Sequence, residues 1–418
     1  MLSKAKHLVG RSLSAIAFLE SALSAGANFA LALAIVRAYP ETTFAGYGTA
    51  ISVVFILQAF ARASLATPAA VKSDAWFVRR AGALLAIHLG LIAMLLALAT
   101  SAAVAVALFV GAPLWWACAA ATPALGLLFF GAEFERVALV KLGRQLTLLV
   151  TAVAAFAAMV ALCGLALWGA IGFGAMMIGV GCVGAARIAV MAATIGRFDA
   201  AAGLRAARLG GPRFVHAGVT TLIGSVACSH APVLILSILS TAQATAAFVA
   251  MRTLYQPMQL VFRSVALVDR TGFHGMLASQ SGTIARLFRR FALRTLALSA
   301  LFAAVLALIG RDLVHHAFGG RFDGSVNVYY MWGLIMIMIN LMSVTDTFIS
   351  NARAEGAYGI AHVSGGAVAV AGALVLIPVH GAMGAAIAAL LGWITIVTIG
   401  ALIIERMPGA RGPDVSQA

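Results

Sequence analysis

Residues 81–109 read AGALLAIHLGLIAMLLALATSAAVAVALF and contain no aspartate, glutamate, lysine or arginine. A helix rises about 1.5 Å per residue, so about 20 such residues cross the hydrocarbon core of a bilayer. This stretch is long enough to do so with residues to spare. The sequence therefore predicts a transmembrane helix here, and the same pattern recurs along the chain.

The composition of the whole chain agrees with a polytopic membrane protein. Of its 418 residues, 63% are hydrophobic and 10% are charged, where a soluble domain carries about 25% charged residues. The mean hydropathy is +1.03. These values predict an all-α polytopic membrane protein and exclude a soluble enzyme, a disordered tail and a fibrous protein. The twelve runs predicted to span the bilayer are 12–36, 44–68, 81–109, 113–133, 146–168, 170–195, 214–239, 242–267, 291–309, 326–350, 357–378 and 382–403.

The basic side chains are divided unequally between the connections of these spans. With twelve spans both termini lie on one side, and together with the even-numbered connections they hold 21 of the 28 lysines and arginines. The positive-inside rule places this set, and so both termini, in the cytoplasm. The net charge of +15 is thus a topology signal, and we expect no nucleic-acid partner. Glu20 interrupts the first apolar run, so we expect an uncleaved first helix and not a signal peptide.

The longest connections suggest how the chain is organised. We expect residues 1–207 to form an N-terminal six-helix bundle, 208–403 a C-terminal six-helix bundle, and 404–418 a cytoplasmic tail. No connection is long enough to fold as a further domain.

An internal repeat supports the division into halves. Predicted spans two and eight both carry Gln-x-x-x-Arg, as Gln58 with Arg62 and as Gln259 with Arg263. Pseudo-symmetric halves are the usual plan of secondary transporters, which bind their substrate at the interface of the repeats. The repeat therefore favours a transporter.

Polar side chains form a stripe along predicted span eight. Arg252, Gln256, Gln259 and Arg263 follow one another at i, i+4, i+7 and i+11, which places them on one face of a continuous helix. A charged side chain at the bilayer centre costs about 2.5–3.5 kcal/mol on insertion scales. We therefore expect this face to line a water-filled cavity, or Arg252 to be a structural arginine paired with a carboxylate. Pro257 is predicted to kink the helix.

Span one offers an acidic counterpart to this stripe. Glu20, Ser24 and Asn28 share one helical face. Glu20 has three candidate roles: a proton- or cation-coupling site, the ion-pair partner of a buried arginine, or a protonated residue between helices. Asp346 lies near the inner boundary of span ten, where a solvated helix end is favoured over a coupling role.

No motif of enzymatic chemistry was found. There is no Walker motif, no nucleophile with its base and no recognised metal-ligand spacing. We therefore expect no catalytic residue, no metal and no cofactor, and the sequence favours a transporter over an enzyme.

Three segments resemble a known family. Thr43-Phe-Ala-Gly-Tyr-Gly48 is close to the Phe-Gly-x-Tyr opening of span two in polysaccharide flippases, although Ala45 separates Phe44 from Gly46 here. Phe318-Gly-Gly-Arg-Phe322 resembles their short outer loop, and 376–388 (LIPVHGAMGAAIA) is similar to their junction between spans eleven and twelve. The chain thus resembles the O-antigen and exopolysaccharide repeat-unit flippases of the multidrug/oligosaccharidyl-lipid/polysaccharide exporter superfamily.

The resemblance implies two six-helix bundles around a central cavity with alternating access. It implies a substrate, an undecaprenyl-pyrophosphate-linked oligosaccharide repeat unit, moved from the cytoplasmic to the periplasmic leaflet of the bacterial inner membrane. It also implies contact with membrane lipids, and with the polysaccharide polymerase and chain-length machinery as further partners. Two other readings stay open: a cation-coupled multidrug exporter of the same fold, and a membrane enzyme such as a polysaccharide polymerase or ligase, which the short outer loops disfavour.

The resemblance also gives the arginines a role. Superfamily members that handle pyrophosphate lipids place arginines on spans two and eight facing the cavity, and here Arg62, Arg252 and Arg263 occupy those spans. Gln58, Gln256 and Gln259 accompany them as candidate substrate-binding residues. Span one departs from the pyrophosphate-handling pattern, because it carries Glu20 and no arginine.

Overall fold

The computed structural model describes residues 2–66, 69, 73–196, 198–201, 212–258, 262, 284–351 and 355–406, and in these residues the chain is all-helical. The main helices are α1 (Leu2–Ala38), α2 (Glu41–Ala61) with the π-helical turn η1 (Arg62–Ala66), α4 (Asp74–Val110), α5 (Pro113–Lys141), α6 (Gln145–Leu167), α7 (Phe173–Ile195), α9 (Pro212–Leu239), α10 (Ala242–Leu254), α12 (Ile284–Leu308), α13 (Gly310–Phe318), α14 (Val326–Asn351) and α15 (Glu355–Arg406).

Ten of the twelve predicted spans fall in helices of the described residues that are long and apolar enough to cross a membrane, span seven coincides with α9, and α10 covers the first part of span eight. Within the described ranges, nine helices are long and apolar enough to cross a membrane. The last of them, Tyr358–Arg406, contains two predicted spans, because Gly381 (φ +52°, ψ −126°) interrupts the helical backbone of α15. The all-α polytopic fold is therefore confirmed.

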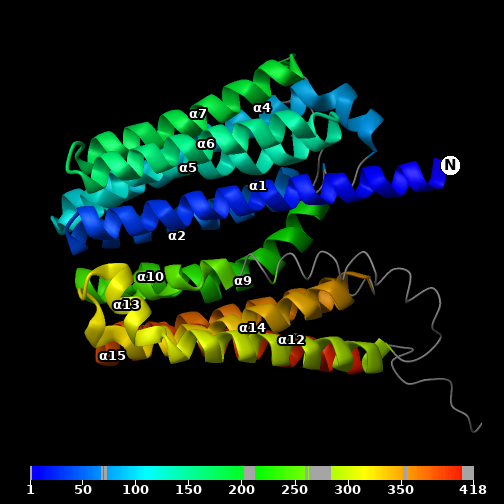
Figure 1. Cartoon of the computed structure of the whole chain (residues 1–418). Helices are drawn as coiled ribbons and strands as arrows, with labels where there is room; N and C mark the ends of the chain where they lie inside the picture. The colour runs from blue at the N-terminus through cyan, green and yellow to red at the C-terminus, as the bar shows by residue number, and fades with distance from the viewer. Residues whose placement is uncertain are drawn as a thin grey trace, which may run out of the picture. The chain divides into compact units, whose positions relative to one another are not determined.

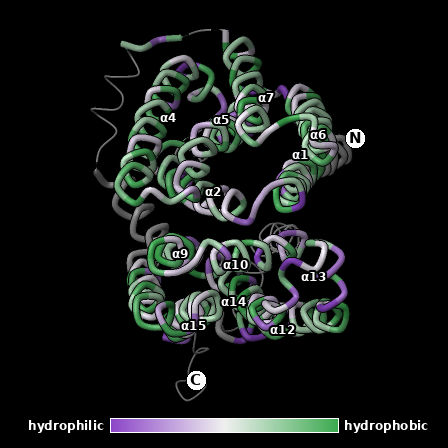
Figure 2. The backbone as a smooth tube through the Cα atoms, turned by 90° about the vertical axis from the view of Figure 1, so that its left-hand side faces the viewer, coloured by the Kyte–Doolittle hydropathy of each residue, from purple (hydrophilic) through white to green (hydrophobic). Residues whose placement is uncertain are grey.

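The chain divides into two compact units, Met1–Val219 and Thr220–Ala418. We call them unit 1 and unit 2. The boundary falls inside α9, whereas the sequence placed it after residue 207; residues 202–211 and 407–418 lie outside the described part. Within each unit the long helices run side by side (Figure 1). Figure 2 shows apolar residues along most of the helices, with polar residues concentrated in the turns.

In unit 1 the central helix is α5, which packs against α2, α4 and α7. In its most apolar window 78% of the residues are buried, against 28% in α4 and in α6. The outer helices instead expose large apolar side chains, Leu98, Phe109 and Ile178 among them. Such exposure is unfavourable in water and is what a bilayer accommodates.

α5 is longer than predicted. The sequence ended span four at residue 133, the first of the three charged residues Glu133, Glu135 and Arg136, but the helix continues to Lys141. This prediction was wrong because each of the three charges has a partner on another helix, as described below. The helix ends where Gly143 adopts a positive φ of 69°, a conformation that glycine adopts without steric cost.

The close crossing of α2 over α5 yields a first prediction. A Cβ built on Gly46 would overlap the carbonyl oxygen of Leu114 and lie 2.6 Å from Cβ of Ala117, whereas one on Gly90 meets nothing within 4 Å. We expect Gly46→Ala to lower the free energy of unfolding by about 1–3 kcal/mol, because helices that pack backbone to backbone must separate. Gly90→Ala, the matched control, should be neutral or stabilising by less than about 1 kcal/mol. Thermal unfolding of the two purified variants measures the difference, and equal midpoints would contradict it.

Candidate functional site

Glu20 lies in a buried ionic cluster of unit 1. Its carboxylate is fully buried and accepts hydrogen bonds from Nε (2.7 Å) and Nη2 (3.1 Å) of Arg136 on α5. Ser24, one turn along α1, donates a third from its hydroxyl at 3.0 Å. Of the three roles expected for Glu20, this geometry favours the ion pair, with an arginine that the sequence had assigned to a cytoplasmic connection.

A second carboxylate completes the cluster. Glu135 is fully buried and accepts hydrogen bonds from Nε of Arg187 on α7 at 2.6 Å and from the hydroxyl of Thr151 on α6 at 2.7 Å. Nη2 of Arg187 stands 3.7 Å from Oε1 of Glu20 and has no hydrogen-bond partner. Two carboxylates and two guanidinium groups thus join α1, α5, α6 and α7 with no net charge. Neutral pairing is what makes such groups tolerable at low dielectric.

Gln58 and Arg62 meet Glu133, the other acidic residue of α5. The Arg62 guanidinium binds the Glu133 carboxylate through two contacts, Nε–Oε1 at 2.9 Å and Nη2–Oε2 at 3.0 Å. Gln58 Nε2 donates to the carbonyl oxygen of Phe129 (3.2 Å) and to Glu133 Oε2 (3.4 Å). Gln58 and Arg62 therefore contact the same carboxylate, and their role as cavity residues stays a prediction. The Arg62 side chain is 44% exposed, which leaves part of it accessible.

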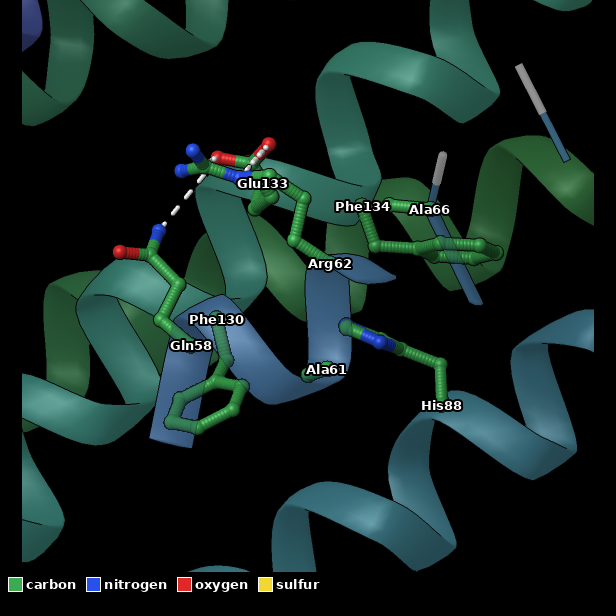
Figure 3. Close-up of a pocket in the computed structure, with 8 residues that line it drawn as sticks. All are labelled: Gln58, Ala61, Arg62, Ala66, His88, Phe130, Glu133 and Phe134. Atoms are coloured by element: carbon green, nitrogen blue, oxygen red, sulfur yellow. Dashed lines mark hydrogen bonds and ion pairs between the residues drawn. The ribbon is translucent and has the colours of Figure 1, made fainter. Parts of the chain in front are cut away.

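These residues line a small pocket (Figure 3), whose other walls are Ala61, Ala66, His88, Phe130 and Phe134. His88 is buried, stacks on the Phe134 ring with centroids 4.4 Å apart, and its Nε2 has no hydrogen-bond partner. Figure 3 shows its imidazole extending towards Ala61. The pocket mixes one ion pair with aromatic walls, so it offers no uncompensated charge to a ligand.

Arg252 of unit 2 lies in a different environment. It is half-buried on α10, and its Nη1 donates to the carbonyl oxygen of Ser229 on α9 at 3.2 Å. Nη1 and Nη2 approach Nδ1 and Nε2 of His230 at 3.2 and 3.4 Å. Cζ lies 5.8 Å from the centroid of Trp332 on α14. Among the residues that the structure describes, no carboxylate comes within 4 Å of this guanidinium, so its positive charge has no ionic partner there.

The predicted polar stripe is not one continuous helix. α10 ends at Leu254, Tyr255 forms a turn, and Gln256 begins a further helical stretch to residue 258. Pro257 explains the break, because it lacks the N–H that would bond to Thr253 and disfavours the helical conformation of the residue before it. Gln256 therefore lies beyond a turn from Arg252 and is partly exposed. Gln259 and Arg263 lie outside the described residues.

Asp346 lies on α14 opposite α15. Its Oδ1 is 3.9 Å from Nε2 of His362, too far for a hydrogen bond, and its side chain is 29% exposed. His362 is buried and its ring packs edge-on against Tyr358, with centroids 4.5 Å apart. The two roles that the sequence left open for Asp346, a solvated helix end and a coupling residue, both stay predictions. No cluster of three potential metal ligands occurs in the parts of the chain that the structure covers.

Sequence reasoning missed the interhelical ion pairs of Glu133, Glu135 and Arg136. A signal was present, because Val137, Ala138, Leu139 and Val140 continue the apolar pattern beyond the three charges. Such a continuation favours a helix that carries charges inward over a helix that ends. No comparable sequence pattern indicated that His230 would contact Arg252.

Comparison with known proteins supports the fold. No protein-family profile matches the sequence, and no curated protein matches it with significant similarity. Solved structures do match over nearly the whole chain. A eukaryotic MATE transporter has a TM-score of 0.65 at 15% identity, over 94% of this chain and 96% of that one.

Two further structures show the same fold. An inward-facing multidrug resistance MATE family transporter of the MOP superfamily gives a TM-score of 0.63 at 11% identity, over 91% of this chain and 94% of that one. A MOP superfamily transporter from Pyrococcus furiosus, described as having a binding pocket of reverse polarity, gives 0.58 at 11% identity over 94% of both chains. The chain therefore has the fold of MATE transporters.

Proposed function

We propose that the protein is a membrane transporter that carries a lipid-linked oligosaccharide with an undecaprenyl-pyrophosphate headgroup from the cytoplasmic to the periplasmic leaflet. Alternating access of the two units to either side would move the anionic headgroup while the polyprenyl tail stays in lipid. The proposal agrees with the fold shared with MATE transporters and with the three flippase-like segments of the sequence.

The observation that carries the proposal is the charge of Arg252. A half-buried guanidinium without a carboxylate partner in the described residues attracts an anion, and it does so more strongly at low dielectric than in water. A guanidinium also presents paired N–H groups that match two oxygens of a phosphate. Arg252 is therefore proposed as the ligand of the pyrophosphate.

The other predicted cavity residues are secondary candidates. Arg62 and Gln58 would have to release Glu133 to reach a substrate. Gln256 lies close to Arg252 in the chain, and Gln259 and Arg263 are proposed from their position in the sequence alone. Glu20 and Asp346 are likewise proposed as coupling residues from their position in the sequence.

A second candidate is a cation-coupled multidrug exporter. The observation in its favour is the likeness to a solved multidrug resistance transporter. Against it stands the pairing in unit 1, where Glu20, Glu133 and Glu135 each bind an arginine and so offer no free carboxylate to an organic cation. A transporter of this fold is also described as having a binding pocket of reverse polarity that suggests a different function, so the fold is not tied to one pocket polarity.

The proposal includes a setting. We place the protein in the bacterial inner membrane with both termini in the cytoplasm, on the distribution of its basic residues. In that setting its partners would be membrane lipids and the polymerase and chain-length machinery that use the flipped repeat unit.

Deletion in the native host tests the proposal. Loss of surface polymer, with undecaprenyl-pyrophosphate repeat units retained on the cytoplasmic face, is the expected result, and a plasmid-borne copy should restore the polymer. Intact polymer with new sensitivity to cationic dyes would contradict the flippase and support the exporter. The two readouts are made on the same strain, so each candidate can fail independently.

A further inference from the structure

Helix α12 of unit 2 is covered by protein less than any other candidate span of the described residues. In its most apolar window 17% of the residues are buried, against 28–78% in the other spans. One side of the helix packs on α14 (Figure 1). There the rings of Phe288 and Phe291 lie 5.4 and 6.0 Å from that of Phe348, measured between centroids. This packing fixes which face of α12 is turned away from the protein.

The exposed face of α12 changes its chemical character towards one end. Leu293, Leu301 and Leu308 are each more than 60% exposed, and at 100° per residue they share a face with Arg286 and Arg290. At 1.5 Å per residue, about 27 Å of helix axis separates Arg290 from Leu308, close to the roughly 30 Å of a hydrocarbon core. When the leucines lie in hydrocarbon, both arginines therefore lie at the level of the lipid headgroups.

The basic end of α12 is only partly neutralised. It consists of four exposed arginines, Arg286, Arg289, Arg290 and Arg294. Arg289 binds Glu405, with Nη2–Oε1 at 2.8 Å, and the guanidinium of Arg294 lies over the ring of Phe291, 5.5 Å from its centroid. Among the residues that the structure describes, no carboxylate comes within 4 Å of Arg286 or Arg290. The basic end thus keeps a net positive charge beside exposed leucines.

We propose that the basic end of α12 and Leu293 bind an anionic phospholipid, whose phosphate contacts the guanidinium groups while an acyl chain lies along the leucines. A guanidinium presents paired N–H groups to two phosphate oxygens. A zwitterionic phospholipid has the same phosphate, but its ammonium group cancels the charge, so the anionic lipid is preferred. This inference goes beyond the proposed function, because it does not depend on what the protein transports.

Native mass spectrometry of the purified full-length protein in detergent tests the proposal. The protein is titrated with phosphatidylglycerol and with phosphatidylcholine of the same acyl chains, and the wild type should bind phosphatidylglycerol at least about fivefold more tightly. Arg286→Gln and Arg290→Gln should each weaken phosphatidylglycerol binding by about fivefold, because each removes one charge near the headgroup. Both variants should bind phosphatidylcholine within about twofold of the wild type. Glycerol 3-phosphate should not displace the lipid, since it has no acyl chain.

Two further variants separate charge from general damage to the fold. Glu405→Gln releases Arg289 from its ion pair and should tighten phosphatidylglycerol binding by about fivefold, because the surface gains one net positive charge. Misfolding cannot produce such a gain. Arg311→Gln is the matched control, because Arg311 on α13 is also an exposed arginine of unit 2 but follows the opposite end of α12. It should leave binding of both lipids within about twofold.

Three results would overturn the proposal. The first is equal affinity of the wild type for the two lipids. The second is equal binding of phosphatidylglycerol by Arg286→Gln, Arg290→Gln and Arg311→Gln. The third is displacement of the lipid by a similar concentration of glycerol 3-phosphate, which would indicate a site for free phosphate. These are binding measurements without transport, so the lipid site can fail while the flippase proposal stands, and the reverse is equally observable.

Discussion

Arg252→Ala is expected to reduce export of lipid-linked repeat units by at least about 100-fold, because charge-assisted hydrogen bonds contribute about 1.5–3 kcal/mol each and the guanidinium fork makes two. Arg252→Lys keeps the charge without the fork and should retain an intermediate rate. The measurement is surface polymer in a deletion strain that carries each variant at equal membrane abundance.

The control for this experiment is an arginine of the same unit with a surface role. Arg289 is exposed and binds Glu405, with Nη2–Oε1 at 2.8 Å, so Arg289→Ala should change export by less than about twofold. Normal export by both Arg252→Ala and Arg252→Lys would show that Arg252 is not a substrate ligand.

Removing a carboxylate from the cluster of unit 1 should have the largest effect on stability. Glu135→Ala leaves Arg187 buried and without the partner of its Nε. We expect the free energy of unfolding to fall by about 3–5 kcal/mol, the usual result of leaving a buried charge uncompensated. Thermal unfolding in detergent or nanodiscs measures the loss.

Two further variants test whether the loss of stability is specific to the buried ion pair. The double variant Glu135→Leu with Arg187→Leu should recover most of the lost stability, because it removes both charges together. Glu405→Ala removes an exposed carboxylate and should cost less than about 1 kcal/mol. If Glu135→Ala and Glu405→Ala unfold at the same temperature, the buried cluster is not a stabilising element.

The fold was predictable because a membrane span depends mainly on local composition. A run such as 81–109 needs no knowledge of its neighbours, and α4 (Asp74–Val110) contains it entirely. Where the prediction failed, the cause was a distant partner. Glu133, Glu135 and Arg136 lie within α5 because Arg62, Arg187 and Glu20 meet them from other helices. The apolar residues 137–140 indicated that the helix continues, but no local pattern identifies the distant partners.

The candidate site was predictable to a smaller degree. The free-energy cost of an ionised side chain within a span was enough to single out Arg252 and Glu20, because such a side chain requires a compensating partner. Which compensation each one receives depends on packing: Glu20 meets Arg136, whereas Arg252 meets the carbonyl oxygen of Ser229, the imidazole of His230 and the indole of Trp332. The sequence predicted a kink at Pro257, and the structure has a turn at Tyr255, so Gln256 does not continue the uninterrupted helix that carries Arg252.

The ion pair of Glu20 has a consequence for biosynthesis. Arg136 lies 116 residues after Glu20 in the chain, and translation at roughly 5–20 residues per second needs on the order of ten seconds to cover that distance. During this interval the first helix has been made but its counter-ion has not. The nascent α1 must therefore wait near the translocon or the water interface until α5 emerges, and membrane integration of unit 1 is completed late and cooperatively, not one span at a time.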